Sequence, residues 1–190
     1  LGGRLYDMFA KTLDANGIHY AANFEEMTAD WVIGDELRIS QAIINFLSNA
    51  VKFTSQGEII VTFRQMMLRD GKVDLMVRVH DTGIGMKAEF ISRIFRLFEQ
   101  EDTSTTRRFG GTGLGMAISD QLVKLMGGQI VVESLPESGS DFTVFLSLPV
   151  MGGRTATRTI RGLAWPDAAD IPIYALSADT CVEDERLSRE

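Results

Sequence analysis

The chain has 190 residues, of which 45% are hydrophobic and 24% charged, with a formal net charge of -7. These values are typical of a soluble globular protein. The acidic balance argues against a general nucleic-acid binder, which needs clustered Lys and Arg. No apolar run approaches the roughly 20 residues that span a membrane, so we expect no membrane contact by this chain, although a longer parent protein could be anchored. The single cysteine, Cys181, fits a reducing, cytoplasmic location.

Apolar periodicity and turn signals divide residues 1–150 into helices and strands. Asp70-Gly71 is a strong hairpin turn signal, and Gly17 and Gly127-Gly128 end two helices. Because the strands and helices do not alternate regularly, we expect an α+β layer fold. The predicted elements are a helix at 4–16, strands at 18–24 and 31–33, a helix from an N-cap at Asp35 to Phe53, strands at 58–66 and 72–80, helices at 88–95 and 114–126, and strands at 129–134 and 141–148. The predicted apolar face of the helix at 114–126 consists of Leu114, Ala117, Ile118, Leu122 and Leu125.

The helix that ends at Phe53 has an unusual distribution of polar side chains. At about 100° per residue, five polar residues form a stripe about 80° wide, while most of the remaining surface is apolar. We therefore expect a helix that is largely buried apart from one polar groove, where buried amides need hydrogen-bond partners. The stripe contains Arg38, Gln41, Asn45, Asn49 and Lys52, and the apolar remainder of the helix contains Leu37, Ile39, Ile43, Ile44, Phe46, Leu47, Ala50, Val51 and Phe53.

Two interpretations of this stripe stay open from the pattern alone. An asparagine carbonyl oxygen is a suitable hard ligand for Mg²⁺, and Lys52, one turn after Asn49, can reach a phosphate group. Alternatively, the stripe is the solvent side of the helix, or it bonds to neighbouring backbone.

The segment DTGIG at 81–85 is a glycine-rich turn after an apolar strand. Gly83 and Gly85 permit a tight backbone close to a ligand. Asp81, at the end of the strand, can accept a hydrogen bond from an exocyclic amine. A lone glycine turn is usually only a turn, so this segment is not specific by itself.

A second glycine-rich segment, GGTGLG at 110–115, precedes a predicted helix. Backbone N–H groups at a helix N-terminus bind phosphate well, but the segment is neither a P-loop nor a dinucleotide fingerprint. The preceding residues 99–112 predict a mobile loop. Within it, Arg107 and Arg108 are either a solvated pair or charge that a closing lid brings to a terminal phosphate.

Together these segments resemble the catalytic ATP-binding domain of sensor histidine kinases, in the GHKL superfamily, over about residues 4–150. The resemblance implies one domain at 1–150 with a two-layer α/β sandwich of Bergerat type, a mixed sheet covered on one face by helices. The matching segments are GDELRISQAIINFLSNAVKFT (34–54, N box), DTGIGM (81–86, first glycine box), IFRLFEQ (94–100, F box) and RRFGGTGLGMAIS (107–119, lid end and second glycine box).

The resemblance also implies ATP and Mg²⁺ as cofactors and gives roles by position. Asn49 would hold Mg²⁺ with Asn45 close by, Lys52 would contact phosphate, and Asp81 would bond the adenine amine in a pocket shaped by Gly83 and Gly85. Phe95 and Phe98 would tether the lid or are ordinary core aromatics. Phosphate contacts would come from the backbone of Gly111, Thr112, Gly113, Leu114 and Gly115, with charge from Arg107 and Arg108.

The residue at position 45 bears on the reaction. Hydrolytic members of the superfamily carry a Glu four residues before the metal-binding Asn, and this chain has Asn45, whose amide is a very poor general base. The resemblance therefore implies transfer of the γ-phosphoryl group to a histidine on a separate dimerisation and phosphoacceptor domain, upstream of a response regulator. The alternatives are a non-catalytic nucleotide-binding module, or a GHKL serine kinase or ATPase.

Two further features of the sequence are its two histidines and its C-terminal tail. His19 and His80 lie in predicted strands and outside the family's acceptor pattern, so we expect no self-phosphorylation. The tail at 151–190 contains one predicted strand at 171–176 but has too few apolar residues for a core of its own, and residues 148–185 are similar to the middle of a receiver domain. The position of the receiver's acceptor Asp is Phe145. We interpret the tail as a receiver remnant in a hybrid kinase shortened by deletion.

Overall fold

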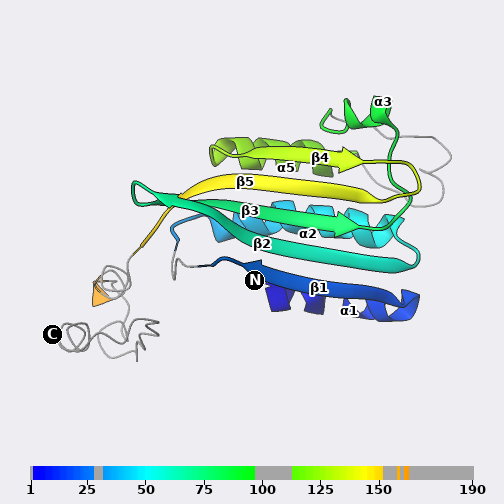
Figure 1. Ribbon diagram of the computed structural model, residues 1–190, viewed down its shortest axis with the longest axis horizontal. Coiled ribbons are helices and arrows are strands. Elements are labelled where there is room, and N and C mark those ends of the chain that lie inside the picture. The colour runs from blue at the N-terminus through cyan, green and yellow to red at the C-terminus, as the bar shows by residue number, and fades with distance from the viewer. Residues whose placement is uncertain (1, 28–31, 97–112, 152–157, 159–160, 163–190) are drawn as a thin grey trace.

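A mixed five-stranded sheet carries the fold, with strand order β1-β2-β3-β5-β4 (Figure 1). The computed structural model describes residues 2–27, 32–96, 113–151, 158 and 161–162. The helices and strands are α1 (Gly2–Asn16), β1 (Ile18–Glu25), α2 (Glu36–Phe53), β2 (Gly57–Arg69), β3 (Lys72–Asp81), α3 (Ala88–Ile91), α5 (Gly115–Leu125), β4 (Gln129–Ser134) and β5 (Ser140–Pro149).

The sheet and the helices form two layers. β1 pairs parallel with β2, whereas the pairs β2–β3, β3–β5 and β4–β5 are antiparallel. Figure 1 shows α1, α2 and α5 on the same face of the sheet. The predicted two-layer α+β architecture is confirmed. Within the described part of the chain, no helix is long and apolar enough to cross a membrane.

The core lies between α2 and the sheet. Phe46 of α2 is fully buried, and its ring stacks on Phe142 of β5 with centroids 5.2 Å apart. Burying an aromatic side chain of this size contributes roughly 1.5–3 kcal/mol. Asp35 caps α2 as predicted, since its carboxylate accepts a hydrogen bond from the N–H of Arg38 at 3.0 Å. The cap at Asp35 therefore fixes where α2 begins, and packing against the sheet fixes which face of α2 is buried.

The hairpin turn at Asp70-Gly71 is also confirmed. Both residues have positive φ, 50° and 69°, as the two central residues of a type I′ turn require. β3 buries Val73, Val77 and Val79 against the helices, while Leu75 is only half-buried.

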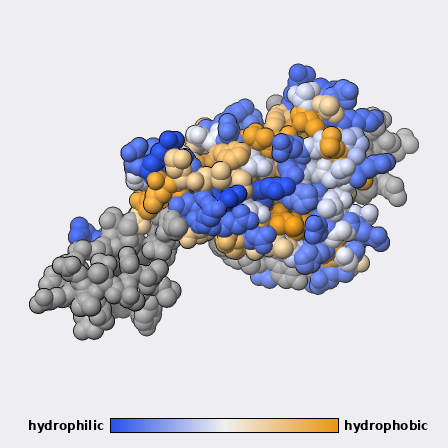
Figure 2. Space-filling model, viewed as in Figure 1, coloured by the Kyte–Doolittle hydropathy of each residue, from blue (hydrophilic) through white to orange (hydrophobic). Residues whose placement is uncertain are grey.

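The opposite face of the sheet, which Figure 2 shows, mixes hydrophilic and hydrophobic residues. Asp141 of β5 accepts hydrogen bonds there from Arg78, at 2.5 Å, and from His80, at 3.1 Å. An antiparallel sheet tolerates this arrangement because one of its faces can contact water.

Three predictions about elements are wrong. The strand predicted for 31–33 is reduced to a single bridge between Val32 and Val150 in the described residues. The helix predicted for 88–95 is the short α3, and turns follow it. Leu37, predicted on the apolar side of α2, is 77% exposed because it lies in the first turn, beyond the region that packs on the sheet.

The predicted apolar face of α5 is only partly right, since Ala117 is buried and Leu114 and Leu122 are half-buried. Ile118 and Leu125, expected to be buried, are 44% and 71% exposed. The helix is rotated relative to the prediction because two polar side chains on its buried side have partners that offset the cost of burial: Ser119 contacts Asn45 and Asp120 contacts Lys124. The buried residues of α5 are Met116, Ala117, Ser119, Asp120 and Val123.

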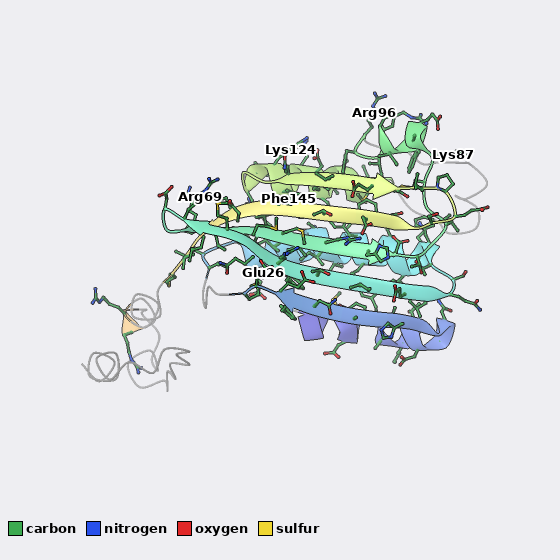
Figure 3. The ribbon with its side chains drawn as sticks, viewed as in Figure 1. Glu26, Arg69, Lys87, Arg96, Lys124 and Phe145 are labelled. Atoms are coloured by element: carbon green, nitrogen blue, oxygen red, sulfur yellow. The ribbon has the colours of Figure 1, made fainter. Side chains whose placement is uncertain are left out.

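Phe145 lies within β5, opposite Met76 of β3 and Gln129 of β4 (Figure 3). The prediction that this residue belongs to the last strand of the domain is confirmed. Nearly all of the tail at 151–190, including the strand expected at 171–176, lies outside the described residues.

Candidate functional site

The polar stripe of α2 divides into two halves with different surroundings. Arg38 and Gln41 are exposed, and Arg38 forms an ion pair with Asp35 at 3.0 Å. This half is the solvent side of the helix, as the second interpretation of the stripe proposed. Asn45, Asn49 and Lys52 are half-buried, so the candidate site is limited to the C-terminal half of the stripe.

Two amides of this half face α5, which packs against α2. The Asn45 side-chain nitrogen donates to the Ser119 hydroxyl at 2.9 Å and lies 3.7 Å from the Met116 sulfur. The Asn49 side-chain nitrogen donates to the same sulfur at 3.3 Å. No role was predicted for Met116 or Ser119 from the sequence.

The Met116 sulfur fixes which end of the Asn49 amide faces α5. A thioether accepts hydrogen bonds weakly and has no proton to donate, so the amide must direct its NH₂ group at it. The Asn49 carbonyl oxygen then points elsewhere, and within the described part of the chain it accepts no hydrogen bond. A half-buried carbonyl oxygen oriented in this way is a suitable ligand for Mg²⁺.

Lys52 lies one turn beyond Asn49 and is also half-buried. Its Nζ lies 4.8 Å from the centroid of the Phe53 ring. Burial lowers the pKa of Lys52 from its ordinary value, because the charged ammonium is poorly solvated there. An anionic ligand would offset this cost, so the position suits a phosphate contact.

Asp81 ends β3 as a buried carboxyl group. It is 4% exposed, and its Oδ1 accepts a hydrogen bond from the N–H of Gly83 at 2.8 Å. Burial raises the pKa of this carboxyl, and the hydrogen bond from Gly83 only partly opposes the shift. The hydrogen bond from Gly83 therefore holds the Asp81 carboxyl in place but does not fully offset the cost of burying its charge. A further hydrogen-bond donor would offset more of this cost.

The glycines after Asp81 are needed by the protein's own packing. A Cβ at Gly83 would lie 2.6 Å from the carbonyl oxygen of Phe53 at the end of α2. Gly85 has φ of 63°, and a Cβ there would collide with the carbonyl of Leu135. Because both residues lack a Cβ, the turn after β3 can pack closely against the end of α2 and against the β4–β5 turn.

The second glycine segment is described only from Gly113 onward. Gly113 has φ of 69°, and α5 begins at Gly115 immediately after Leu114. Phe95 is half-buried and packs against the core, in agreement with its interpretation as a core aromatic. The other predicted residues of the lid and the phosphate loop, Phe98, Arg107, Arg108, Gly111 and Thr112, lie outside the described residues.

The remaining features of the described chain do not form a second candidate. A depression of about 250 Å³ lies beside Gly83, and its lining includes neither Asn45, Asn49 nor Asp81. Within the described residues, no group of three or more His, Cys, Asp or Glu side chains gathers to hold a metal. An ion at Asn49 would therefore depend on this carbonyl together with the ligand's own phosphates, as is common for Mg²⁺.

Residues 34–150 match the model of a family described as histidine kinase-, DNA gyrase B- and HSP90-like ATPases. The signal transduction histidine-protein kinase BarA of Escherichia coli K12 is 40% identical over 141 residues, which are 74% of this chain and 15% of BarA. The sensor histidine kinase RcsC of Salmonella typhimurium LT2 is 43% identical over 132 residues, 69% of this chain and 13% of RcsC. The chain thus spans about one seventh of the length of these relatives.

Solved structures show the same fold. Full-length ShkA in complex with AMPPNP superposes with a TM-score of 0.65 at 29% identity, over 78% of this chain and 29% of ShkA. The nucleotide-free catalytic domain of the histidine kinase ThkA gives a TM-score of 0.57 at 26% identity, over 77% of this chain and 88% of that domain.

Proposed function

Because the chain belongs to the family of histidine kinase-, DNA gyrase B- and HSP90-like ATPases, we propose that it binds Mg-ATP and transfers the γ-phosphoryl group to a histidine on a separate dimerisation and phosphoacceptor domain. The observation that carries this proposal is the Asn49 amide, whose nitrogen donates to the Met116 sulfur while its carbonyl oxygen accepts no hydrogen bond in the described part of the chain, one helical turn before the half-buried Lys52. The relatives named above are sensor or signal transduction histidine kinases.

Each residue of the site has a distinct part in this proposal. The Asn49 carbonyl would ligate Mg²⁺, and Lys52 would bind phosphate. The buried Asp81 carboxylate would accept a hydrogen bond from the adenine amine. Bound Mg²⁺ would supply charge neutralisation at the phosphates, the main need of phosphoryl transfer. The backbone of Gly111, Thr112, Gly113, Leu114 and Gly115 would bind the phosphates, with Arg107 and Arg108 approaching from the lid.

Asn45 stands where a general base would activate water in hydrolytic relatives. An amide has no basic group at neutral pH, and the nitrogen of Asn45 is already bonded to Ser119. The site would therefore keep ATP intact until an acceptor histidine approaches. This property suits a kinase better than an ATPase.

The partners and setting of the whole protein extend the proposal. The acceptor domain would lie in the same parent protein, and a response regulator would receive the phosphoryl group from it, in the cytoplasm. Residues 1–150 would form the ATP-binding domain. The tail at 151–190 would be a remnant of a receiver domain that cannot accept phosphate, since Phe145 stands at the acceptor position and belongs to β5.

Two measurements test this function. Calorimetry with AMPPNP should show binding that is much stronger with Mg²⁺ than with a chelator. The chain should then phosphorylate a histidine on an added helical acceptor domain from a homologous kinase. Binding without transfer would favour the non-catalytic regulatory module, and absence of binding would contradict the proposal.

A further inference from the structure

Ser119 is a buried hydroxyl on α5, whose other buried residues are Met116, Ala117, Asp120 and Val123. It is 1% exposed and accepts the hydrogen bond from the Asn45 amide at 2.9 Å. The same nitrogen lies 3.7 Å from the Met116 sulfur. Asn45 therefore directs its NH₂ group at α5, across a sequence separation of 74 residues.

The oxygen end of the Asn45 amide also lies against α5. A Cβ added to Gly115 would lie 3.0 Å from Cγ and 3.1 Å from Nδ2 of Asn45, and still closer to Oδ1. The space in which residue 115 would place a side chain is thus occupied by the Asn45 amide. The glycine at the first position of α5 meets this steric requirement of α2.

The other buried polar side chain of α5 behaves differently. Asp120 accepts a hydrogen bond from Lys124 of the same helix at 2.7 Å. Figure 3 shows Lys124 beyond the β4 edge of the sheet, away from β1 and β2. Asp120 and Lys124 therefore provide a matched pair for comparison, since their contact stays within α5.

We propose that Asn45 is a positioning residue that acts through α5, an inference that rests on the proposed function. Asn45, Gly115 and Ser119 form what we call the α2–α5 pin, which holds the start of α5 at a fixed place relative to Asn49. The backbone N–H groups at the start of α5 and the carbonyl of Asn49 would contact the same polyphosphate. A displacement of about 1 Å between such groups is enough to weaken their joint action strongly.

The pin would act on the phosphate and metal end of the ligand, and none of its three residues forms a hydrogen bond with Asp81 in the described part of the chain. Loss of the pin should therefore weaken binding of Mg-AMPPNP while the affinity for adenosine, which has no phosphate, stays unchanged. A purely structural role for Ser119 would instead lower both affinities together with the melting temperature.

The experiment is a double-mutant cycle on the full chain. We expect Ser119→Ala to weaken Mg-AMPPNP binding, measured by calorimetry, roughly threefold to tenfold, the effect of one neutral hydrogen bond. Asn45→Ala should weaken it at least as much, and the double variant no further than Asn45→Ala alone, because the two changes remove one interaction. Lys124→Met is the matched control on α5 and should leave the affinities for Mg-AMPPNP and adenosine unchanged.

A second double-mutant cycle tests whether the Asn45 amide occupies the space that a side chain at position 115 would need. Gly115→Ala should weaken Mg-AMPPNP binding, and adding Asn45→Ala should restore part of it by vacating the space. Additive effects of Ser119→Ala and Asn45→Ala would overturn the inference, as would equal losses for adenosine. A Gly115→Ala defect that is the same with and without Asn45 would also overturn it. A wild-type chain that does not bind Mg-AMPPNP would instead refute the proposed function, so the two failures are distinguishable.

Discussion

The side-chain nitrogen of Asn49 lies 3.3 Å from the sulfur of Met116, on a helix that begins 66 residues later in the chain. Because the sulfur can only accept a hydrogen bond, this contact decides which end of the Asn49 amide is left for a ligand. The proposed metal ligand is therefore oriented before any ion binds, and the expected consequences can be measured.

We predict that Asn49→Ala weakens Mg-dependent nucleotide binding by about tenfold or more, because it removes the proposed protein ligand of the metal. The measurement is the affinity for AMPPNP with and without Mg²⁺. Gln41→Ala is the control, since Gln41 lies on the same stripe of α2 but is exposed. Equal affinity of wild type and Asn49→Ala for Mg-AMPPNP would remove the metal role.

Asp81→Asn should weaken binding of adenine nucleotides but leave binding of tripolyphosphate unchanged. The carboxylate is buried and fixed by Gly83, so its replacement by an amide changes the partner of the base without moving the phosphate contacts. Competition binding with ATP and tripolyphosphate tests this. A parallel loss for both ligands would show that Asp81 supports the whole site and does not select the base.

The affinity for adenine nucleotides should fall as the pH is lowered from 7. Burial raises the pKa of Asp81, so the carboxyl gains a proton at a higher pH than an ordinary Asp, whose pKa is about 3.9. The neutral group is a weaker acceptor for the adenine amine, and binding is lost in that range. Titration of the affinity between pH 7 and 4 tests this, and Asp81→Asn should show no such loss. An affinity that rises as the pH is lowered would contradict this prediction.

Incubation of the isolated chain with ATP should leave no stable phosphohistidine. His19 lies on β1 and His80 on β3, where the His80 ring contacts Asp141 at 3.1 Å. Acid-labile labelling followed by mass spectrometry is the measurement. Label at either residue would contradict this placement of the histidines, and steady ATP hydrolysis typical of a dedicated ATPase would contradict the role given to Asn45.

A chain that ends at Met151 should retain the nucleotide affinity of the full chain. The described site residues lie before residue 120, and β5 completes the sheet at Pro149. The melting temperature and the mass in solution need not be the same for the two chains, because only the full chain contains the apolar segment at 171–176, which is costly to leave exposed. Affinity, melting temperature and mass should be compared for the two chains. A large loss of affinity in a shortened chain that remains folded would refute this prediction.

The helix and the turn that carry the candidate residues could be predicted from the sequence, but the contacts between these residues could not. The turn after Asp81 and the half-buried part of the stripe, Asn45, Asn49 and Lys52, follow from short-range patterns, whereas Arg38 and Gln41 of the same stripe are exposed. The buried face of α5 was predicted only in part, because Ile118 and Leu125 are more hydrophobic than Ser119 and Asp120, which are buried while these two are exposed. Periodicity cannot register that a polar residue has a partner elsewhere, so Met116 and Ser119 were missed.

The sequence by itself determined the order of the helices and strands apart from the strand expected at 31–33, and it determined the cap at Asp35 and the turn at Asp70-Gly71. These features depend on backbone preferences and on contacts between residues three or four positions apart. The tertiary structure alone decided that Asn45 bonds Ser119 and that Asn49 bonds Met116. Such contacts exist only after the sheet has placed α2 and α5 side by side, since β2, β3 and α3 lie between the two helices in the chain and no local signal fixes their rotation.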